Sequence, residues 1–311
     1  MITYVLGRVL LTIPVLVGAA IFIFLLFELI PGDVVSAAMG VQLLDADQQA
    51  AMRAALGLDR PMTDRLLDYV AGLVQGDLGR SLRTSQAVLP MILAQLPSTL
   101  ILIAAGLSVA LLIGIPLGLL AALRRNSWVD AVSMSGAVLG VSIPQYWLGL
   151  VLILIFAVWL RWLPATGSST PESLILPAIT LGVAEAAIIA RLVRSSMVET
   201  LGADFVRTAR AKGLADHRVV IRHAFRNSLI PVVTMLGLQI GALLGGAVVI
   251  EVVFARPGIG QMIVTAITKR DLPVVQGGVL TIAVIFVLVN LVVDILYGRL
   301  DPRVRLGKDA A

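Results

Sequence analysis

The chain has 311 residues, of which 59% are hydrophobic and only 14% are charged, and its formal net charge is +5. An average soluble domain is roughly half apolar and about a quarter charged, so this composition is typical of a membrane protein and argues against an ordinary water-soluble domain. The sequence contains no cysteine, which excludes disulfides, thiolate metal sites and a catalytic thiol.

The apolar residues are concentrated in long runs, from which we predict six transmembrane helices. Each run has about twenty residues or more, enough to cross a hydrocarbon core of about 30 Å at about 1.5 Å per residue. Lipid offers the backbone no hydrogen bonds, so such runs must be helical and the predicted fold is all-α. The first run is too long for a signal peptide, and we interpret it as an uncleaved anchor. The predicted helices cover residues 9–30, 97–123, 131–159, 174–194, 229–253 and 274–297.

The basic residues between these helices predict the orientation of the chain. Lys and Arg are enriched in short cytoplasmic loops. With a cytoplasmic N-terminus and C-terminus, fifteen of them lie inside and four lie in the short outer loops. The inner set is Arg8, Arg124, Arg125, Arg191, Arg194, Arg207, Arg210, Lys212, Arg218, Arg222, Arg226, Arg299, Arg303, Arg305 and Lys308, and the outer set is Arg161, Arg256, Lys269 and Arg270.

A segment at 31–96 separates the first two predicted helices and is expected outside the membrane. Asp45 precedes an Ala-rich stretch closed by Gly57, and Pro61 opens another that ends near Gly76, so we predict two short helices there. The predicted organisation is an N-terminal transmembrane helix at 1–30, an extracytoplasmic segment at 31–96, a five-helix core at 97–297 and a cytoplasmic tail at 298–311.

The inner loop between the fourth and fifth predicted helices has helical punctuation of its own. Asp204 is expected to cap a helix that ends at Lys212, with Gly213 at the C′ position, where glycine commonly adopts the left-handed conformation. Asp216 is expected to cap a second helix that carries arginines at every fourth position. The loop is therefore predicted to be a helix-turn-helix hairpin. The arginines are Arg218, Arg222 and Arg226.

The two helices of this hairpin suggest different roles. Positive-inside bias and attraction to anionic lipid explain the arginines of the second helix. The first helix has small residues, Ala209 and Ala211, near its end, and Phe205 as an apolar knob. Such a shape suits docking to another protein.

Several stretches of the chain resemble the inner-membrane permeases of dipeptide, oligopeptide and nickel ABC importers. The hairpin looks like this family's form of the permease EAA loop, with Arg207 where the general motif has glutamate; its matching residues are Arg207-Thr208-Ala209-Arg210-Ala211-Lys212-Gly213 and Arg226-Asn227-Ser228-Leu229-Ile230-Pro231. Other matches, in order along nearly the whole chain, are Ile30-Pro31-Gly32-Asp33, Leu56-Gly57-Leu58-Asp59-Arg60-Pro61, Gly76-Asp77-Leu78-Gly79, Pro257-Gly258-Ile259-Gly260 and Asn290-Leu291-Val292-Val293-Asp294.

The resemblance implies a type I ABC importer permease fold with a cytoplasmic coupling loop at about 195–228. It also implies a second homologous permease, two ATPase subunits that bind ATP and Mg²⁺, and an extracytoplasmic solute-binding protein, with membrane lipid around the chain and no nucleic acid. The chain has no G-x-x-x-x-G-K-[ST] phosphate loop, so we expect no cofactor and no enzymatic activity in it. The residues implied in ATPase coupling are Phe205, Arg207, Thr208, Ala209, Arg210, Ala211, Lys212 and Gly213.

Polar residues inside the predicted spans are candidates for the solute pathway. Glu185 lies about eleven residues into the fourth span, roughly 16 Å deep, so it should face the bundle interior. A structural hydrogen bond and a pathway role are both open for it. Gln145, Gln239 and the pair Asn290 and Asp294 are weaker candidates, for which interhelical hydrogen bonds are the default.

Three glycines, Gly237, Gly241 and Gly245, form a small-residue stripe on the fifth span that should allow close helix packing. The only histidines, His217 and His223, lie in the inner loop beside no paired carboxylate. We therefore expect no catalytic and no metal site.

The solute remains open at this point. Dipeptides, longer peptides, glutathione-like compounds and nickel chelates all fit the resemblance. A secondary transporter or channel is the alternative of another class, because a buried glutamate would serve it too, but the sequence has no self-similar halves of the kind common in such carriers.

Overall fold

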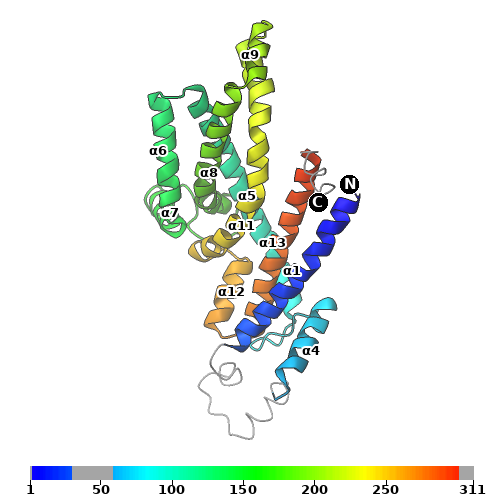
Figure 1. Ribbon diagram of the computed structural model, residues 1–311. Helices are drawn as coiled ribbons and strands as arrows, with labels where there is room; N and C mark the ends of the chain where they lie inside the picture. The colour runs from blue at the N-terminus through cyan, green and yellow to red at the C-terminus, as the bar shows by residue number, and fades with distance from the viewer. Residues whose placement is uncertain (1, 30–58, 301–311) are drawn as a thin grey trace. The chain divides into compact units, whose positions relative to one another are not determined.

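A computed structural model describes residues 2–29 and 59–300, and these are helical apart from connecting turns and an isolated antiparallel bridge between Arg80 and Ala87. Figure 1 shows the arrangement. The α-helices are α1 (Ile2–Glu28), α4 (Met62–Val74), α5 (Val88–Leu123), α6 (Trp128–Ser142), α7 (Gln145–Leu152), α8 (Ile175–Leu201), α9 (Asp204–Ala211), α10 (Asp216–Arg218), α11 (Arg226–Val253), α12 (Ile259–Thr268) and α13 (Leu272–Leu300). Two π-helical segments, η1 (Ile153–Trp159) and η3 (Val219–Phe225), and one 3-10 segment, η2 (Pro171–Leu174), complete the described chain.

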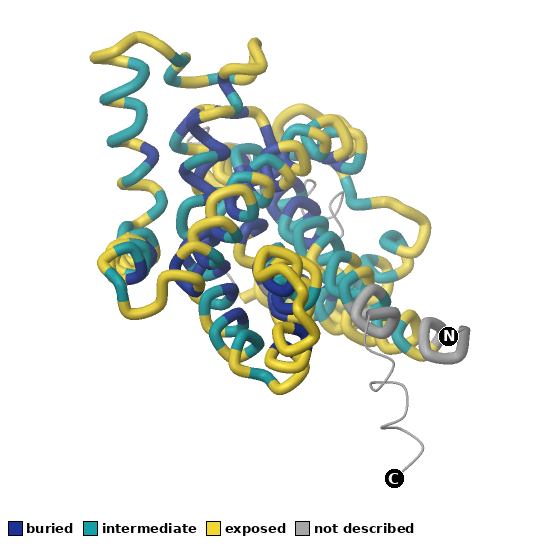
Figure 2. Tube along the Cα trace, turned by 90° about the horizontal axis from the view of Figure 1, so that it is seen from above, coloured by how far each residue is buried: buried dark blue, intermediate teal, exposed yellow. Residues whose placement is uncertain are grey.

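The chain divides into two compact units. The first comprises Met1–Thr99 and Pro257–Leu288, and the second comprises Leu100–Arg256 and Val289–Ala311. In both units the buried positions lie where helices face one another, and long exposed stretches cover the other sides (Figure 2). Many of the exposed side chains are large and apolar, as expected for surfaces that face lipid.

In the first unit, α4 packs against α1. Arg65 Nη1 lies 2.7 Å from Glu28 Oε1, and the rings of Phe24 and Tyr69 are 5.5 Å apart. The predicted punctuation of this helix is confirmed, because Pro61 directly precedes it and Gly76 follows it with φ +78°. The other predicted short helix, between Asp45 and Gly57, lies outside the described residues.

The start of α5 and the short helix α12 form the second hydrophobic contact of this unit. Ile92 of α5 and Ile259 and Ile263 of α12 are buried together, and the backbone N–H of Ile259 donates to Thr99 Oγ1 at 2.9 Å. The sequence analysis predicted no helix between the spans at 229–253 and 274–297 and therefore missed α12.

The second unit is built around α8, which packs against α6, α7 and α11. It also approaches α5 very closely, since a Cβ atom built on Gly114 would lie 2.6 Å from the carbonyl oxygen of Ala186. A Cβ on Gly182 of α8 would likewise lie 2.5 Å from the carbonyl oxygen of Gly106. Glycine is thus required on both helices for this backbone approach.

Within residues 2–29 and 59–300, four helices are long and apolar enough to cross a membrane alone, and the number rises to six if two bent pairs each count as one span. The predicted second helix begins earlier than expected, at Val88. Pro90 lies in its first turn, where a missing N–H costs no intrahelical hydrogen bond. The predicted span at 229–253 is part of the second bent pair, which bends by 47°.

The prediction of one continuous helix over 131–159 is wrong. The chain bends by 102° between α6 and α7. Proline has no N–H and disfavours helical angles in the residue before it. Accordingly Ile143 is extended at φ −81° and ψ 123°, and a new helix starts after Pro144.

Candidate functional site

Helix α9 is an eight-residue amphipathic helix that follows α8. Its residues Val206 and Ala209 are buried, and they pack into a hydrophobic cluster with side chains of α8 and η3 such as Met197 and Val220. Since positions three apart share one face of a helix, this pair determines which side of α9 faces the rest of the second unit.

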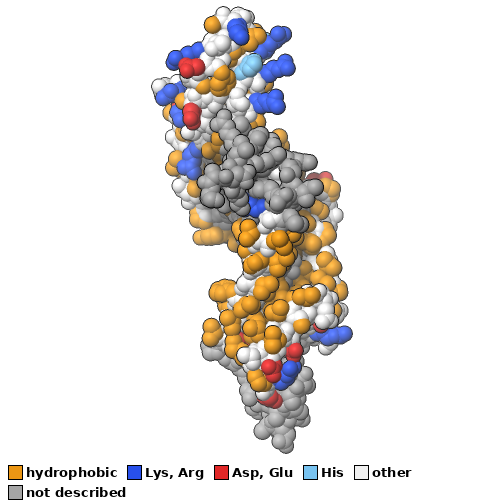
Figure 3. Space-filling model, turned by 45° about the vertical axis from the view of Figure 1, so that its right-hand side comes forward, with side chains coloured by type: hydrophobic (Ala, Val, Ile, Leu, Met, Phe, Trp, Pro, Cys, Tyr) orange, Lys and Arg blue, Asp and Glu red, His pale blue; other side chains and the backbone are white. Residues whose placement is uncertain are grey.

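The opposite face of α9 is open and basic. The side chain of Arg207 is 75% exposed, and Phe205 is a large apolar residue that is 45% exposed. In Figure 3, Lys and Arg side chains gather around a histidine at the top of the view. Because the only histidines are His217 and His223, this is the end that carries the hairpin. The other exposed coupling candidates on the helix and just beyond it are Thr208, Arg210, Ala211, Lys212 and Gly213.

The end of α9 is a Schellman turn. The backbone N–H of Gly213 donates to the carbonyl of Arg210 at 2.9 Å, and that of Leu214 donates to the carbonyl of Ala209 at 3.4 Å. These are the two hydrogen bonds that define the motif, which places its C′ residue in the left-handed region. Gly213 has φ +78°, as the sequence analysis predicted. Arg210 Nε lies 3.0 Å from Asp216 Oδ1 and ties the turn to the next helix.

The predicted N-caps of the hairpin are wrong by one residue. The N-cap positions are Ala203 and Ala215, and neither side chain can cap. Asp204 and Asp216 are instead the first helical residues. A carboxylate in the first turn still favours the helix through the dipole.

The predicted second helix of the hairpin is not separate from the fifth span. Segments α10, η3 and α11 follow one another without a break, because the junction residues Arg218 and Phe225 keep helical angles. The π-helical η3 also changes the spacing, so Arg218, Arg222 and Arg226 do not form a simple α-helical stripe, although all three are exposed.

The polar candidates of the predicted spans lie on four helices of the second unit. Glu185 of α8 is only 4% exposed, and its Oε2 has no hydrogen-bond partner among the described residues. Gln239 of α11 is also buried, whereas Gln145 of α7 and Asn290 of α13 are half-buried. The side chain of Asp294 lies outside the described part of the chain.

The three stripe glycines do not all make close contacts. A Cβ atom on Gly237 would lie 2.7 Å from Val293 of α13, but one on Gly245 would meet no atom within 4 Å. Gly241 is half-buried. Gly246, next to Gly245, makes an equally close approach, because a Cβ there would lie 2.7 Å from Gln145 Oε1. The predicted close packing thus holds at Gly237 and not at Gly245 within this chain.

Comparison with known families covers both ends of the chain. Residues 114–306 match the family described as "Binding-protein-dependent transport system inner membrane component". Residues 1–103 match the N-terminal family of such membrane components. The first match alone covers more than half of the chain. The chain belongs to this family.

Named relatives of this permease align along almost their whole length. The di/tripeptide transport system permease protein DppB of Pseudomonas aeruginosa is 43% identical over 98% of this chain and 99% of its own. The glutathione transport system permease protein GsiC of Salmonella choleraesuis is 44% identical with the same coverage.

A solved structure supports the fold of the permease. An inward-facing MetNI methionine ABC transporter chain superposes with a TM-score of 0.54 at 20% identity, over 68% of this chain and 96% of that one. The permease therefore has the type I importer fold and is a multi-pass inner-membrane protein.

The sequence analysis missed an ion pair in the permease. Arg194 of α8 donates to both carboxylate oxygens of Asp130 at the start of α6, at 2.5 and 2.6 Å. Asp130 is buried and also accepts from the backbone N–H of Asn126 at 3.0 Å. Arg194 had been counted as a loop charge that marks the inner side. The available signal was the lone acidic residue after Ser127 at the start of an apolar run.

Proposed function

We propose that this permease forms half of the translocation pathway of an ATP-driven importer for peptides or related small solutes, and that α9 is the helix to which a separate ATPase subunit docks. In this proposal the five-helix core at 97–297 lines the pathway, and a second homologous permease supplies the other half. Two ATPase subunits bind ATP and Mg²⁺, an extracytoplasmic binding protein delivers the solute, and this chain hydrolyses nothing itself.

The observation that carries the proposal is the two-sided construction of α9. One side is anchored by Val206 and Ala209 in the second unit, and the other presents Phe205 and Arg207 to the surroundings. A surface that joins an apolar knob to exposed cations fits a groove on a protein partner. The anchored side packs on α8 and η3, and η3 continues into α11, so movement of the partner would be transmitted to the membrane helices.

The peptide class rests on the relatives. Their names specify di/tripeptide and glutathione transport, and both solutes are short peptides with free carboxylates. Transport of peptides without any ATPase partner would instead favour the secondary-transporter alternative.

Gly213 is the most informative position at which to test the docking role of α9. An added Cβ would meet no atom within 4 Å, so a substitution there acts only through the left-handed backbone angle. We expect Gly213→Val to strain or re-aim the turn at a cost of about 1–2 kcal/mol, to leave the spans inserted, and to weaken ATPase binding or uncouple hydrolysis from uptake. The measurements are copurification of the ATPase and solute-stimulated hydrolysis in reconstituted membranes.

Two matched variants control this experiment. Asparagine tolerates the left-handed region, so Gly213→Asn should retain most of the coupling. Arg222→Ala removes an exposed cation of η3 and should have a smaller effect than Gly213→Val. Normal coupling in Gly213→Val together with a loss in Arg222→Ala would move the docking contact to η3.

A further inference from the structure

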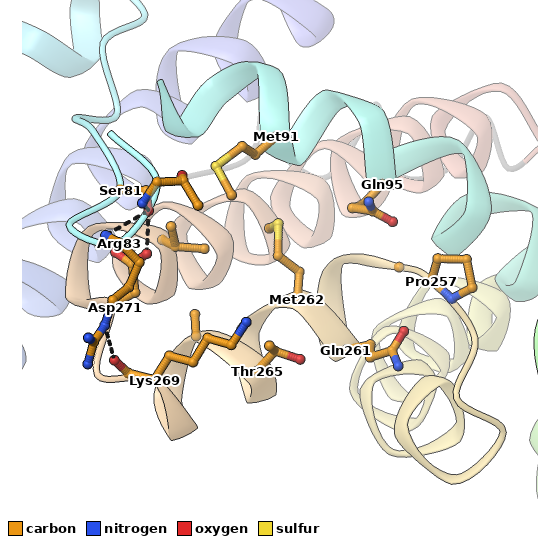
Figure 4. Close-up of a pocket in the computed structure, with 14 residues that line it drawn as sticks. Ser81, Arg83, Met91, Gln95, Pro257, Gln261, Met262, Thr265, Lys269 and Asp271 are labelled. Carbon is orange, nitrogen blue, oxygen red and sulfur yellow. Dashed lines mark hydrogen bonds between the residues drawn. The ribbon is translucent and has the colours of Figure 1, made fainter. Parts of the chain in front are cut away.

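The first unit contains a cavity of about 260 Å³ that the proposed function does not use. Its walls come from the 81–84 turn, the first turns of α5, the residues 257–258 before α12, and α12 with the turn that follows it. Figure 4 shows these segments around the cavity. In the predicted topology both contributing regions, 31–96 and the connection between the fifth and sixth spans, lie on the outer side of the membrane.

One end of this cavity is a closed hydrogen-bond network. The buried carboxylate of Asp271 accepts from Ser81 Oγ and, at 3.0 Å, from the backbone N–H of Leu82. Ser81 Oγ in turn accepts from the N–H of Thr84 at 3.0 Å. Arg83 Nε donates to the carbonyl of Lys269 at 2.9 Å. The network holds the turn against α13 and occupies the carboxylate of Asp271, the only one among the described residues that line the cavity.

The ammonium group of Lys269 does not belong to this hydrogen-bond network. Figure 4 shows it extending away from the network toward Thr265 and Met262. No salt bridge joins Lys269 to another described residue. The cavity therefore presents the Lys269 ammonium in addition to the Arg83 guanidinium, whose Nε is already bonded to the Lys269 carbonyl. The Thr265 hydroxyl and the Gln95 amide lie along its walls as further hydrogen-bonding groups.

The remaining walls are apolar and adaptable. Met91 and Met262 line the cavity with Val274. Methionine side chains are unbranched and flexible, so they accommodate ligands of different shape. A ligand that fits has one anionic group for Lys269 and an apolar body of variable form.

We propose that this cavity is a capture subsite for the carboxylate of the transported peptide, with the carboxylate bonded to Lys269 and a neighbouring side chain packed against Met91 and Met262. The identity of the ligand rests on the proposed function. Charge-assisted hydrogen bonds to a carboxylate are stronger than neutral ones, whereas the methionines give little discrimination among side chains. The subsite thus recognises what short peptides share and tolerates what differs among them.

The test is binding of a fluorine-labelled dipeptide, alanyl-4-fluorophenylalanine, to the complete permease and ATPase complex in nanodiscs without binding protein, followed by ¹⁹F NMR. We expect the dipeptide to bind about tenfold more tightly than its C-terminal amide, a difference of about 1.4 kcal/mol. Lys269→Gln should abolish this preference and Lys269→Arg should retain it. Arg270→Gln is the matched control, because it removes the neighbouring charge, which does not line the cavity, and should leave the preference intact.

Equal binding of acid and amide by the unaltered complex, or an unchanged preference in Lys269→Gln, would overturn the subsite. Docking of the solute-binding protein is measured in the same variants. If Lys269→Gln loses docking while dipeptide binding is unchanged, the cavity receives a carboxylate of that protein and the proposal is wrong. Failure of the proposed function has a separate signature, namely no ATP-dependent peptide uptake by the unaltered complex supplied with its binding protein.

Discussion

Glu185 is a buried carboxyl group, one oxygen of which has no hydrogen-bond partner among the described residues. A buried polar group without a partner costs about 1–3 kcal/mol of folding stability. Stability therefore does not explain why a glutamate occupies this position in an apolar helix. Its burial agrees with the prediction from its depth in the fourth span, whereas a role in the pathway stays a prediction.

We expect Glu185→Gln to lower peptide uptake while changing the free energy of unfolding by no more than about 2 kcal/mol, because the amide keeps the shape and removes the titratable proton. Uptake in proteoliposomes and thermal unfolding in detergent measure the two effects. Glu199→Gln, an exposed position on the same helix, is the control. If uptake and stability were both unchanged in Glu185→Gln at neutral and acidic pH, the carboxyl group would have no functional role.

At the scale of elements, the packing of α5 on α8 depends on glycine. A side chain on Gly114 would collide with the backbone of α8, since its Cβ would lie 2.6 Å from the carbonyl of Ala186. Backbone cannot move aside as a flexible side chain does. The interface therefore has little tolerance for added volume.

Gly114→Ala should destabilise the permease by about 1–3 kcal/mol through overpacking. Gly136→Ala on α6 is the matched control, because an added Cβ there would meet no atom within 4 Å, and alanine favours a helix over glycine. The measurement is the midpoint of thermal unfolding of the purified subunit. Equal midpoints for the two variants would contradict the close approach of α5 and α8.

At the scale of the whole molecule, the distribution of basic residues predicts a cytoplasmic hairpin and cytoplasmic termini. Since the chain has no cysteine, single cysteines report the side directly. In intact cells, a membrane-impermeant thiol reagent should label Ser169→Cys in a predicted outer loop and should not label Arg210→Cys at the hairpin. Labelling of position 210 alone would reverse the topology.

The sequence predicted those features that depend on local chemistry. Long apolar runs must be helices in lipid, so α1, α5, α8 and α13 were anticipated. Gly213 was expected in the left-handed region because a glycine after basic helical residues is a strong C′ signal. The burial of Glu185 was expected from its position in an apolar helix.

Other features required the tertiary structure. Pro144 was visible in the sequence, but proline can kink a helix or end it, and only the packing of α7 on α8 and α11 decided for a bend of 102°. The Asp130–Arg194 pair and the Asp271–Ser81 network join residues 64 and 190 positions apart. Local sequence determines hydrophobicity, helical periodicity and turn chemistry, whereas pairing across such distances depends on which helix faces come together, and no local signal encodes that.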